Sequence, residues 1–183
     1  EADFIPRSYA NRRGKGTHKA VEQLQDDIRR TRRDTGEGWY LKLDVQSFFR
    51  SINREILFSL VEKKITSTSK ASPQKAQWVE EVLWLARKII FHDPTKNYLY
   101  KGNPDKKSLI QKHKSLFYVQ DCGLPIGNLT SQFFANVYLN ELDQFVTATL
   151  GIERYIRYVD DFVIVDEDKN KLKSLIAPVD AFL

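Results

Sequence analysis

The chain has 183 residues and contains no methionine, one cysteine and three histidines. With Cys122 alone, neither an intramolecular disulfide framework nor a cluster of thiolate metal ligands can form. The histidines, His18, His92 and His113, lie far apart and lack the spacing of metal ligands, so we expect structural or surface roles for them. These scarcities favour a reducing, intracellular environment and argue against a protein built on disulfides or thiolate metal clusters.

Long apolar runs are also missing. None approaches the roughly 20 residues that span a membrane, and nothing at the start resembles a signal peptide, so we expect no contact with a membrane. The sequence does not start with methionine and stops within a helical pattern, from which we expect an internal piece of a longer protein. Hydrophobic residues make up 42% and aromatic residues 12%, which favours one ordered globular core.

Charge is distributed unevenly along the chain, whose net charge is +5. Residues 1–33 contain nine Lys and Arg against five Asp and Glu, and residues 93–114 contain six against two. Residues 151–183 reverse the balance, with five against seven. A basic surface suits phosphate binding and an acidic one suits metal ions. Ordinary solvated charge is the alternative, and charge alone does not decide between them.

The stretch Tyr155–Val165, YIRYVDDFVIV, predicts a tight β-hairpin with Asp160 and Asp161 at its tip. Its apolar flanks place the two carboxylates at the edge of a packed core, where they repel one another unless a cation offsets their charge. Mg²⁺ prefers oxygen ligands and is typically held by one or two carboxylates together with substrate phosphates. A solvated Asp-Asp turn is the alternative, which the dipeptide alone leaves open.

A second stretch, Trp39–Phe49 (WYLKLDVQSFF), predicts a strand that ends at Asp44. Strand alternation separates an apolar face with Trp39, Leu41 and Leu43 from a polar face with Tyr40, Lys42 and Asp44. The Asp44 carboxylate can therefore point into a cleft. A third stretch, residues 123–132 (GLPIGNLTSQ), is a Gly/Pro loop that leads into a helix.

In order, LDVQSFF, GLPIGNLTSQ and YVDD resemble motifs A, B and C of reverse transcriptases. The resemblance implies an α+β polymerase palm, with a small antiparallel sheet backed by helices, plus a partial fingers lobe. It assigns residues 39–66 and 123–183 to the palm, and residues 1–38 and 67–122, approximately, to fingers-related segments. We expect the thumb, motif D and the fingers strand that usually contacts the triphosphate to lie outside this sequence.

By the same resemblance, Asp44, Asp160 and Asp161 are the catalytic carboxylates and hold two Mg²⁺ ions, with the Val45 carbonyl as a further ligand. Mn²⁺ is a possible substitute. Two such ions lower the pKa of a primer 3′-hydroxyl and neutralise the triphosphate and the leaving pyrophosphate. The implied reaction transfers deoxynucleotides from deoxynucleoside triphosphates to a DNA or RNA primer on an RNA template. The alternatives are aspartates that only cap strands, and a polymerase-like nucleic-acid binder without catalysis.

The resemblance also assigns contacts to nucleotides and nucleic acid. Those expected around the incoming nucleotide are Gln46, Ser47, Phe48, Phe49, Pro125, Ile126 and Gly127. Phe49 resembles the steric gate that clashes with a ribose 2′-hydroxyl and so selects deoxynucleotides. Those expected to bind template and primer are Arg12, Arg13 and Lys15, within SYANRRGKGTH, and Tyr158. A basic loop capped by a helix is the alternative interpretation of any single arginine there.

Motif B carries a subfamily signal. Ile126-Gly127 and Ser131-Gln132 stand where most retroviral and group II intron enzymes have Gln-Gly and Ser-Pro. These choices, with SYANRRGKGTH, HDPTKNY and SQFFANVYLNELDQFV, resemble the reverse transcriptases of diversity-generating retroelements. That family copies a template-repeat RNA with frequent errors at adenines and works with a small basic accessory protein. We therefore expect a cytoplasmic, bacterial or phage-encoded enzyme of this kind, with a group II intron or retron enzyme as the alternative.

Apolar spacing further predicts five helices. Their expected positions are Thr17 (as N-cap) to about 33, Asn53 (as N-cap) to 65, Ser72-Pro73 to 89, Thr130 to Val146, and a last helix capped by Asp168 and bent near Pro178. Residues predicted to face inward include Ile56, Leu60, Val61, Trp78, Val82, Leu85, Ala86, Ile89, Phe133, Val137, Leu142, Leu172, Leu175, Ile176 and Val179. Residues 91–122 are predicted to be rich in loops.

Overall fold

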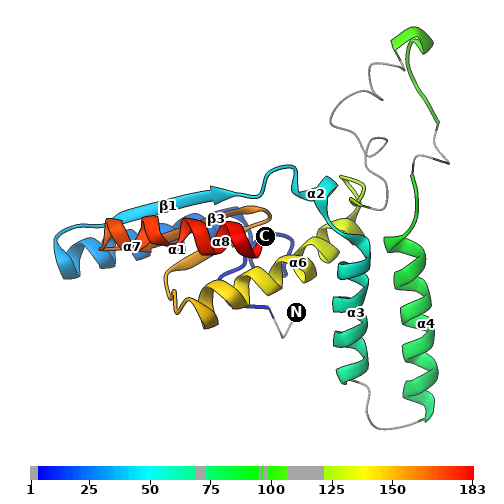
Figure 1. Cartoon of the computed structure of the whole chain (residues 1–183), viewed down its shortest axis with the longest axis horizontal. Coiled ribbons are helices and arrows are strands. Elements are labelled where there is room, and N and C mark those ends of the chain that lie inside the picture. The colour runs from blue at the N-terminus through cyan, green and yellow to red at the C-terminus, as the bar shows by residue number, and fades with distance from the viewer. Residues whose placement is uncertain (1–3, 69–72, 95, 97–98, 107–121) are drawn as a thin grey trace. The chain divides into compact units, whose positions relative to one another are not determined.

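The computed structural model describes residues 4–68, 73–94, 96, 99–106 and 122–183. The chain divides into two compact units. The first, which we call the sheet unit, comprises Glu1–Gln46 and Leu139–Leu183; the second, the helical unit, is Ser47–Tyr138. The predicted α+β class is confirmed, because the described residues combine helices with one small antiparallel sheet (Figure 1).

The sheet contains three strands in the order β1-β3-β2, with both neighbouring pairs antiparallel. Their bounds are Trp39–Asp44 (β1), Tyr155–Tyr158 (β2) and Asp161–Asp166 (β3). Register places Leu43 opposite Phe162 and Asp44 opposite Asp161. Because side chains alternate across a strand, the sheet has one apolar face and, at the motif-A strand, one polar face. The predicted alternation of β1 and the predicted hairpin are therefore confirmed.

Helices pack on both faces of this sheet. Helix α1 (Thr17–Thr35) contacts β2 and β3, where Tyr9 and Ala20 form a buried cluster with Ile156. Helix α7 (Lys169–Ser174) contacts β1 and β3 and is followed by α8 (Ile176–Phe182). The buried Leu172 and Val179 of these two helices confirm their predicted inward positions.

Helix α6 (Leu129–Gln144) crosses the boundary between the units and continues into a π-helical turn, Phe145–Thr149. In the sheet unit its buried residues include Leu142 and Asp143. The prediction of a helix from about Thr130 to Val146 is confirmed to within two residues, and the chain beyond Gln144 changes from α-helical to π-helical hydrogen bonding.

The helical unit contains α2 (Phe48–Ser51), α3 (Arg54–Thr68), α4 (Pro73–Ile90) and a short 3₁₀ turn, Pro104–Lys106. Helices α3 and α4 contact one another along their lengths and run side by side in Figure 1. Their buried residues include Leu57, Val61, Ala86 and Ile90. Helix α4 begins at Pro73, as predicted, because proline at the first helical position lacks only a donor that the helix does not use.

The predicted helix caps have mixed outcomes. Asn53 Oδ1 accepts hydrogen bonds from the backbone N–H groups of Glu55 and Ile56, and Asp168 caps α7 in the same way. Thr17, by contrast, is already helical, and Gly16 precedes it as the N-cap without a side-chain bond. The predicted cap at Ser72 and most of the basic segment 93–114 lie outside the described residues.

Five residues predicted to face inward are exposed instead. They are Ile56, Trp78, Leu85, Phe133 and Ile176, with exposed fractions of 44% to 53%. Leu85 and Phe133 nevertheless line an apolar pocket, together with Val82 and Ile89. Helical spacing identifies an apolar stripe, but the stripe on each of these helices is wider than the surface that packs on it. The last helix is interrupted at Leu175, three residues before Pro178, which lacks the N–H that would continue it.

Candidate active site

The predicted catalytic carboxylates lie at one end of the sheet. Asp44 is the last residue of β1 and pairs in register with Asp161, the first residue of β3. Directly opposed residues of an antiparallel pair share a face and lie about 5 Å apart at Cα. The backbone N–H of Val45 donates to the Asp160 carbonyl oxygen at 3.3 Å, which ties the hairpin turn to the end of β1. The structure thus brings the ends of motifs A and C together within the sheet unit.

Asp160 sits in a two-residue turn. Tyr158 pairs with Asp161, so Val159 and Asp160 alone connect β2 to β3. Val159 has φ of 57°, in the left-handed region that a β-branched residue rarely adopts. Such a conformation costs on the order of 1–3 kcal/mol and persists only where neighbouring interactions impose it. The turn that carries Asp160 is therefore held in a strained shape.

Arg157 supplies one of those interactions. Its Nη1 donates to the Val159 carbonyl oxygen at 2.9 Å. Its Nε and Nη2 donate to Oδ1 and Oδ2 of Asp143 in α6, each at 2.7 Å. The side chains of Arg157 and Asp143 are 1% and 0% exposed. One guanidinium therefore links the strained turn to the helix behind the sheet.

Tyr155 completes this buried network. Its hydroxyl donates to Asp143 Oδ1 at 2.8 Å. Burial raises the pKa of Tyr155 well above its usual value, and the negative charge of Asp143 adds to the effect. The hydroxyl thus keeps its proton and remains a donor, and the Asp143 carboxylate accepts from three donors in all.

On the polar face, Lys42 forms an ion pair with Asp161. Its Nζ lies 2.8 Å from Asp161 Oδ1, and the two side chains are 60% and 46% exposed. The hydrogen bond to Asp161, together with the charges of Asp161 and Asp44, raises the pKa of Lys42. The ammonium group therefore stays charged and offsets part of the negative charge at this end of the sheet.

The donor set suits a hard divalent cation. Partial burial raises the pKa of the Asp160 carboxyl, the backbone N–H of the same residue opposes this, and the charges of Asp44 and Asp161 raise it further. The three negative charges repel one another, so a bound cation would stabilise the ionised carboxylates. Mg²⁺ prefers oxygen ligands of this kind. In the described part of the chain, however, no three acidic, histidine or cysteine side chains already converge in metal-binding geometry. The chemistry of the donors fits Mg²⁺, and their side chains would have to reorient around it.

The residues predicted around the incoming nucleotide begin with Gln46 and otherwise lie in the helical unit. Ser47 adopts φ of 58° and precedes α2, and its Oγ accepts from Arg50 Nη2 at 2.6 Å. Phe48 is buried and packs edge-on against Phe49, with ring centroids 5.4 Å apart.

Within the helical unit, the start of motif B is bonded to the segment after motif A. The Leu124 N–H donates to the Phe49 carbonyl at 2.7 Å, and the Gly123 N–H donates to Ile52 at 2.8 Å. Arg54 Nε in turn donates to the Gly123 carbonyl at 2.8 Å. The loop then exposes Ile126, at 76%, and Gly127, whose φ of 99° suits glycine. The structure thus brings the Phe49 segment and the Pro125–Gly127 loop together.

The residues predicted to bind template and primer have varied surroundings. Arg12 Nη1 donates to the carbonyls of Ile5 and Ser8 and to Ser8 Oγ, so its guanidinium secures the N-terminal loop. Lys15 Nζ donates to the Pro6 carbonyl at 2.6 Å, and Arg13 is exposed. Thr17 Oγ1 donates to the Tyr158 hydroxyl at 2.9 Å. Arg13 is therefore the most accessible of the three predicted basic residues.

Comparison with known proteins decides the family. A family profile described as Reverse transcriptase (RNA-dependent DNA polymerase) matches residues 2–183. The chain belongs to the reverse transcriptase family. The retron Ec73 reverse transcriptase of Escherichia coli is 35% identical over 75 residues, which cover 38% of this chain and 24% of the relative. The match thus spans a minor part of that reverse transcriptase.

Three residues of this candidate site are not identified by the sequence patterns. Arg157 and Asp143 lie 14 positions apart and on different elements, and Lys42 was placed only on the polar face of its strand. A signal was present for Arg157, because an arginine between apolar strand residues must find a buried acceptor. Its partner was not identifiable from spacing.

Among the helices that the structure describes, none combines the length and the apolar character of a membrane span.

Proposed function

We propose that this reverse transcriptase chain carries the residues that join deoxynucleotides to a primer on an RNA template, with Asp44, Asp160 and Asp161 as the metal-binding carboxylates. The observation that carries the proposal is the register pairing of Asp44 with Asp161, with Asp160 in the adjoining turn. Two Mg²⁺ ions bound there, or Mn²⁺ in their place, would activate the primer hydroxyl and neutralise the triphosphate. Template RNA, a DNA or RNA primer and deoxynucleoside triphosphates are the expected substrates.

The protein's own part in this reaction is to place three carboxylates accurately. The β1–β3 register sets Asp44 against Asp161, and the Val45–Asp160 backbone bond closes the gap between the strand end and the turn. Arg157 holds the Val159 carbonyl, so the turn keeps the shape that presents Asp160. We assign Arg157 and Asp143 as positioning residues, because neither belongs to the polar face that carries the aspartates.

Primer extension by the full-length protein on a defined RNA template tests the proposal. Asp160→Asn and Asp44→Asn should each reduce extension by roughly a hundredfold or more, because metal binding supplies several kcal/mol of transition-state stabilisation. Asp180→Asn, which neutralises an exposed carboxylate on α8, is the matched control and should retain full activity. Extension that persists in both site variants would refute the assignment. RNA binding without extension by the unmodified protein would favour a non-catalytic binder instead.

For the biological system, we propose copying of a template-repeat RNA in a diversity-generating retroelement, with a small basic accessory protein as partner. The support is the motif-B loop, where Ile126 is exposed and offers no polar group to a base or sugar. Loss of a polar contact there weakens base selection, so errors at template adenines should depend on this side chain. Ile126→Gln should lower misincorporation opposite adenine in sequenced extension products.

The retron relative supports a second candidate, a retron enzyme, over the 75 residues that it shares with this chain. Sequencing the extension products separates the two. Frequent errors confined to template adenines favour the diversity-generating element, and a uniformly low error rate at all four template bases favours the retron. An adenine error rate that Ile126→Gln leaves unchanged would break the link between this loop and mutagenesis.

A further inference from the structure

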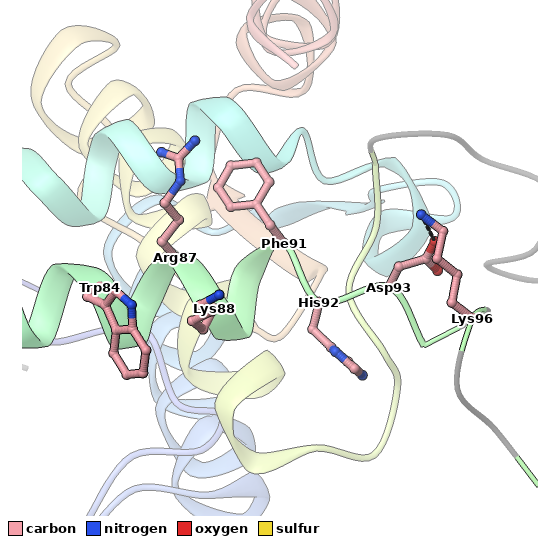
Figure 2. Close-up of a pocket in the computed structure, with 7 residues that line it drawn as sticks. All are labelled: Trp84, Arg87, Lys88, Phe91, His92, Asp93 and Lys96. Carbon is pink, nitrogen blue, oxygen red and sulfur yellow. Dashed lines mark ion pairs between the residues drawn. The ribbon is translucent and has the colours of Figure 1, made fainter.

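The C-terminal half of α4 forms one wall of a cavity of about 470 Å³ in the helical unit. Its lining residues are Trp84, Arg87, Lys88, Phe91, His92, Asp93 and Lys96. Positions 84, 87, 88 and 91 follow the spacing that places side chains on one face of a helix. Figure 2 looks onto this face and shows Arg87 and Phe91 along one margin and Trp84 and His92 along the other. We call this feature the α4 pocket.

Aromatic rings and cations are paired on both margins of the α4 pocket. The Arg87 guanidinium lies over two rings that contact one another edge-on, 5.1 Å from the centroid of Phe58 and 5.0 Å from that of Phe91. The Lys88 ammonium lies 5.9 Å from the Trp84 ring, whose residue is 63% exposed. A guanidinium has five N–H donors, so contact with the rings leaves donors of Arg87 available to an acceptor.

The pocket also has an excess of positive charge. Asp93 is its one acidic residue, and its Oδ2 pairs with Lys96 Nζ at 3.7 Å. Within the part of the chain that the structure describes, no ion pair joins a carboxylate to Arg87 or Lys88. Lys88, next to the exposed indole of Trp84, and Arg87, on the opposite margin, therefore have no ion-pair partner among the described residues.

We propose that the α4 pocket binds single-stranded nucleic acid, with a base stacked on Trp84 and the neighbouring phosphate held by Lys88 and Arg87. The combination matches the known chemistry of single-strand binding, in which aromatic rings stack on bases and a basic groove follows the backbone. The cavity volume lies within the range of small-molecule and nucleotide-sized ligand sites. RNA and DNA share this chemistry, so the pocket serves a single strand of either kind.

An alternative explanation covers only part of these observations. Arg87 and Lys88 lie in the last turn of α4, where basic residues stabilise the negative end of the helix dipole. That effect explains two cations but requires no indole beside them. An acidic peptide would likewise satisfy the cations and leave the Trp84 ring without a stacking partner. A nucleotide unit uses both groups at once.

Fluorescence of Trp84 tests stacking directly. In a protein with Trp39→Phe and Trp78→Phe, Trp84 is the only remaining tryptophan. Titration with a 12-nucleotide RNA or DNA strand, in EDTA so that no catalysis occurs, should quench its emission. An abasic strand of the same length and polyglutamate are the two polyanion controls. Quenching by strands with bases and not by either control supports the proposal, and no quenching, or equal quenching by polyglutamate, overturns it.

Binding of a labelled strand, followed by anisotropy, tests the same proposal without altering the other tryptophans. Trp84→Leu should weaken binding about five- to a hundredfold, the range for loss of one stacked base. Lys88→Gln should lower the slope of log affinity against log salt by about 0.7. The matched controls are Trp78→Leu, an exposed indole on the same helix, and Lys101→Gln, an exposed lysine in the same unit.

The outcomes separate this proposal from the catalytic one. The pocket variants and their controls could lose affinity equally, with unchanged thermal melting. That result would show that the strand binds by charge without a defined site, and it would overturn the proposal for the α4 pocket. Asp160→Asn should bind the strand as well as the unmodified protein, because the α4 pocket contains none of the proposed metal ligands. Loss of extension in Asp160→Asn therefore tests only the catalytic proposal, and the binding data alone test the α4 pocket.

Discussion

Asp143 in α6 and Arg157 in β2 form a two-pronged ion pair, with both nitrogen–oxygen distances at 2.7 Å and both side chains nearly inaccessible to solvent. The third guanidinium nitrogen, Nη1, reaches the carbonyl of Val159 in the turn that carries Asp160. The pair thus has two separable effects. It satisfies two buried charges, and it supports a backbone conformation that valine adopts only under constraint.

Breaking this pair should lower the free energy of unfolding. Asp143→Asn leaves the Arg157 charge buried without a full counter-charge, which typically costs about 3–5 kcal/mol. Urea denaturation should show that loss in the free energy of unfolding. Asp180→Asn, on the surface of α8, should change it by less than about 0.5 kcal/mol.

A triple variant separates stability from positioning. Arg157→Met, Asp143→Leu and Tyr155→Phe together replace the buried polar groups with apolar ones of similar size, an exchange that is often neutral or stabilising. The free energy of unfolding should return close to that of the unmodified protein, while the Val159 carbonyl loses its hydrogen-bond donor. Primer extension should remain low, with a fall in kcat and a higher Mg²⁺ requirement. Recovery of full activity with recovered stability would show that Arg157 has a structural role only.

Removal of Lys42 should strengthen metal binding. Its ammonium occupies Asp161 Oδ1 at 2.8 Å, so a cation that binds this carboxylate must first displace it. Lys42→Gln should lower the Mg²⁺ concentration for half-maximal extension by a few-fold, and the effect should shrink at high salt, since both partners are largely exposed. Lys101→Gln is the matched control. A raised Mg²⁺ requirement would instead indicate that Lys42 contacts substrate.

Shortening Phe49 should relax the choice of sugar. The ring is half-buried and lies edge-on to Phe48, which gives it a defined position beside the start of the motif-B loop. Phe49→Ala should raise kcat/KM for ribonucleoside triphosphates relative to deoxynucleoside triphosphates, as expected when a steric barrier is removed. Phe133→Ala, a half-exposed phenylalanine of the same unit, is the control. An unchanged ratio in single-nucleotide extension would exclude Phe49 as the gate.

Acid should remove the contribution of the Asp166–Lys171 pair to the free energy of unfolding. Burial tends to raise the pKa of Asp166, but hydrogen bonds from Lys171 and from the Asp168 backbone N–H outweigh it, so the pKa lies below its usual value. A carboxylate with a depressed pKa stabilises the fold above its unfolded-state pKa of about 3.9, and this contribution disappears as pH falls through the lower folded value.

The matching variant is Lys171→Met. It should reduce the free energy of unfolding by less than about 1 kcal/mol at pH 7, because Lys171 is about half exposed. In a series of urea denaturations from pH 7 to pH 3, the difference from the unmodified protein should begin to narrow below about pH 4. Lys173→Met, on the same helix, should show no such narrowing. A difference that is constant across the series would exclude the ion pair as its cause.

The sequence by itself determined the features that depend on neighbours along the chain. Alternation in Trp39–Asp44 predicted which face carries Asp44, and the apolar flanks of Asp160 and Asp161 predicted the hairpin. Caps at Asn53 and Asp168 were equally predictable, because a cap bonds to backbone two or three residues away. Three ordered motifs were enough to indicate the reverse transcriptase family.

Only the tertiary structure decided the relationships between distant segments. It selected Asp143 as the partner of Arg157, brought Lys42 to Asp161, and left Trp78 and Ile56 exposed on stripes that looked internal. The physical reason is that periodicity defines a face of an element, whereas burial and ion pairing depend on which other element packs against that face. The strained φ of Val159 is likewise supported from outside the turn. Its carbonyl accepts from Arg157, whose guanidinium is held by Asp143 in α6.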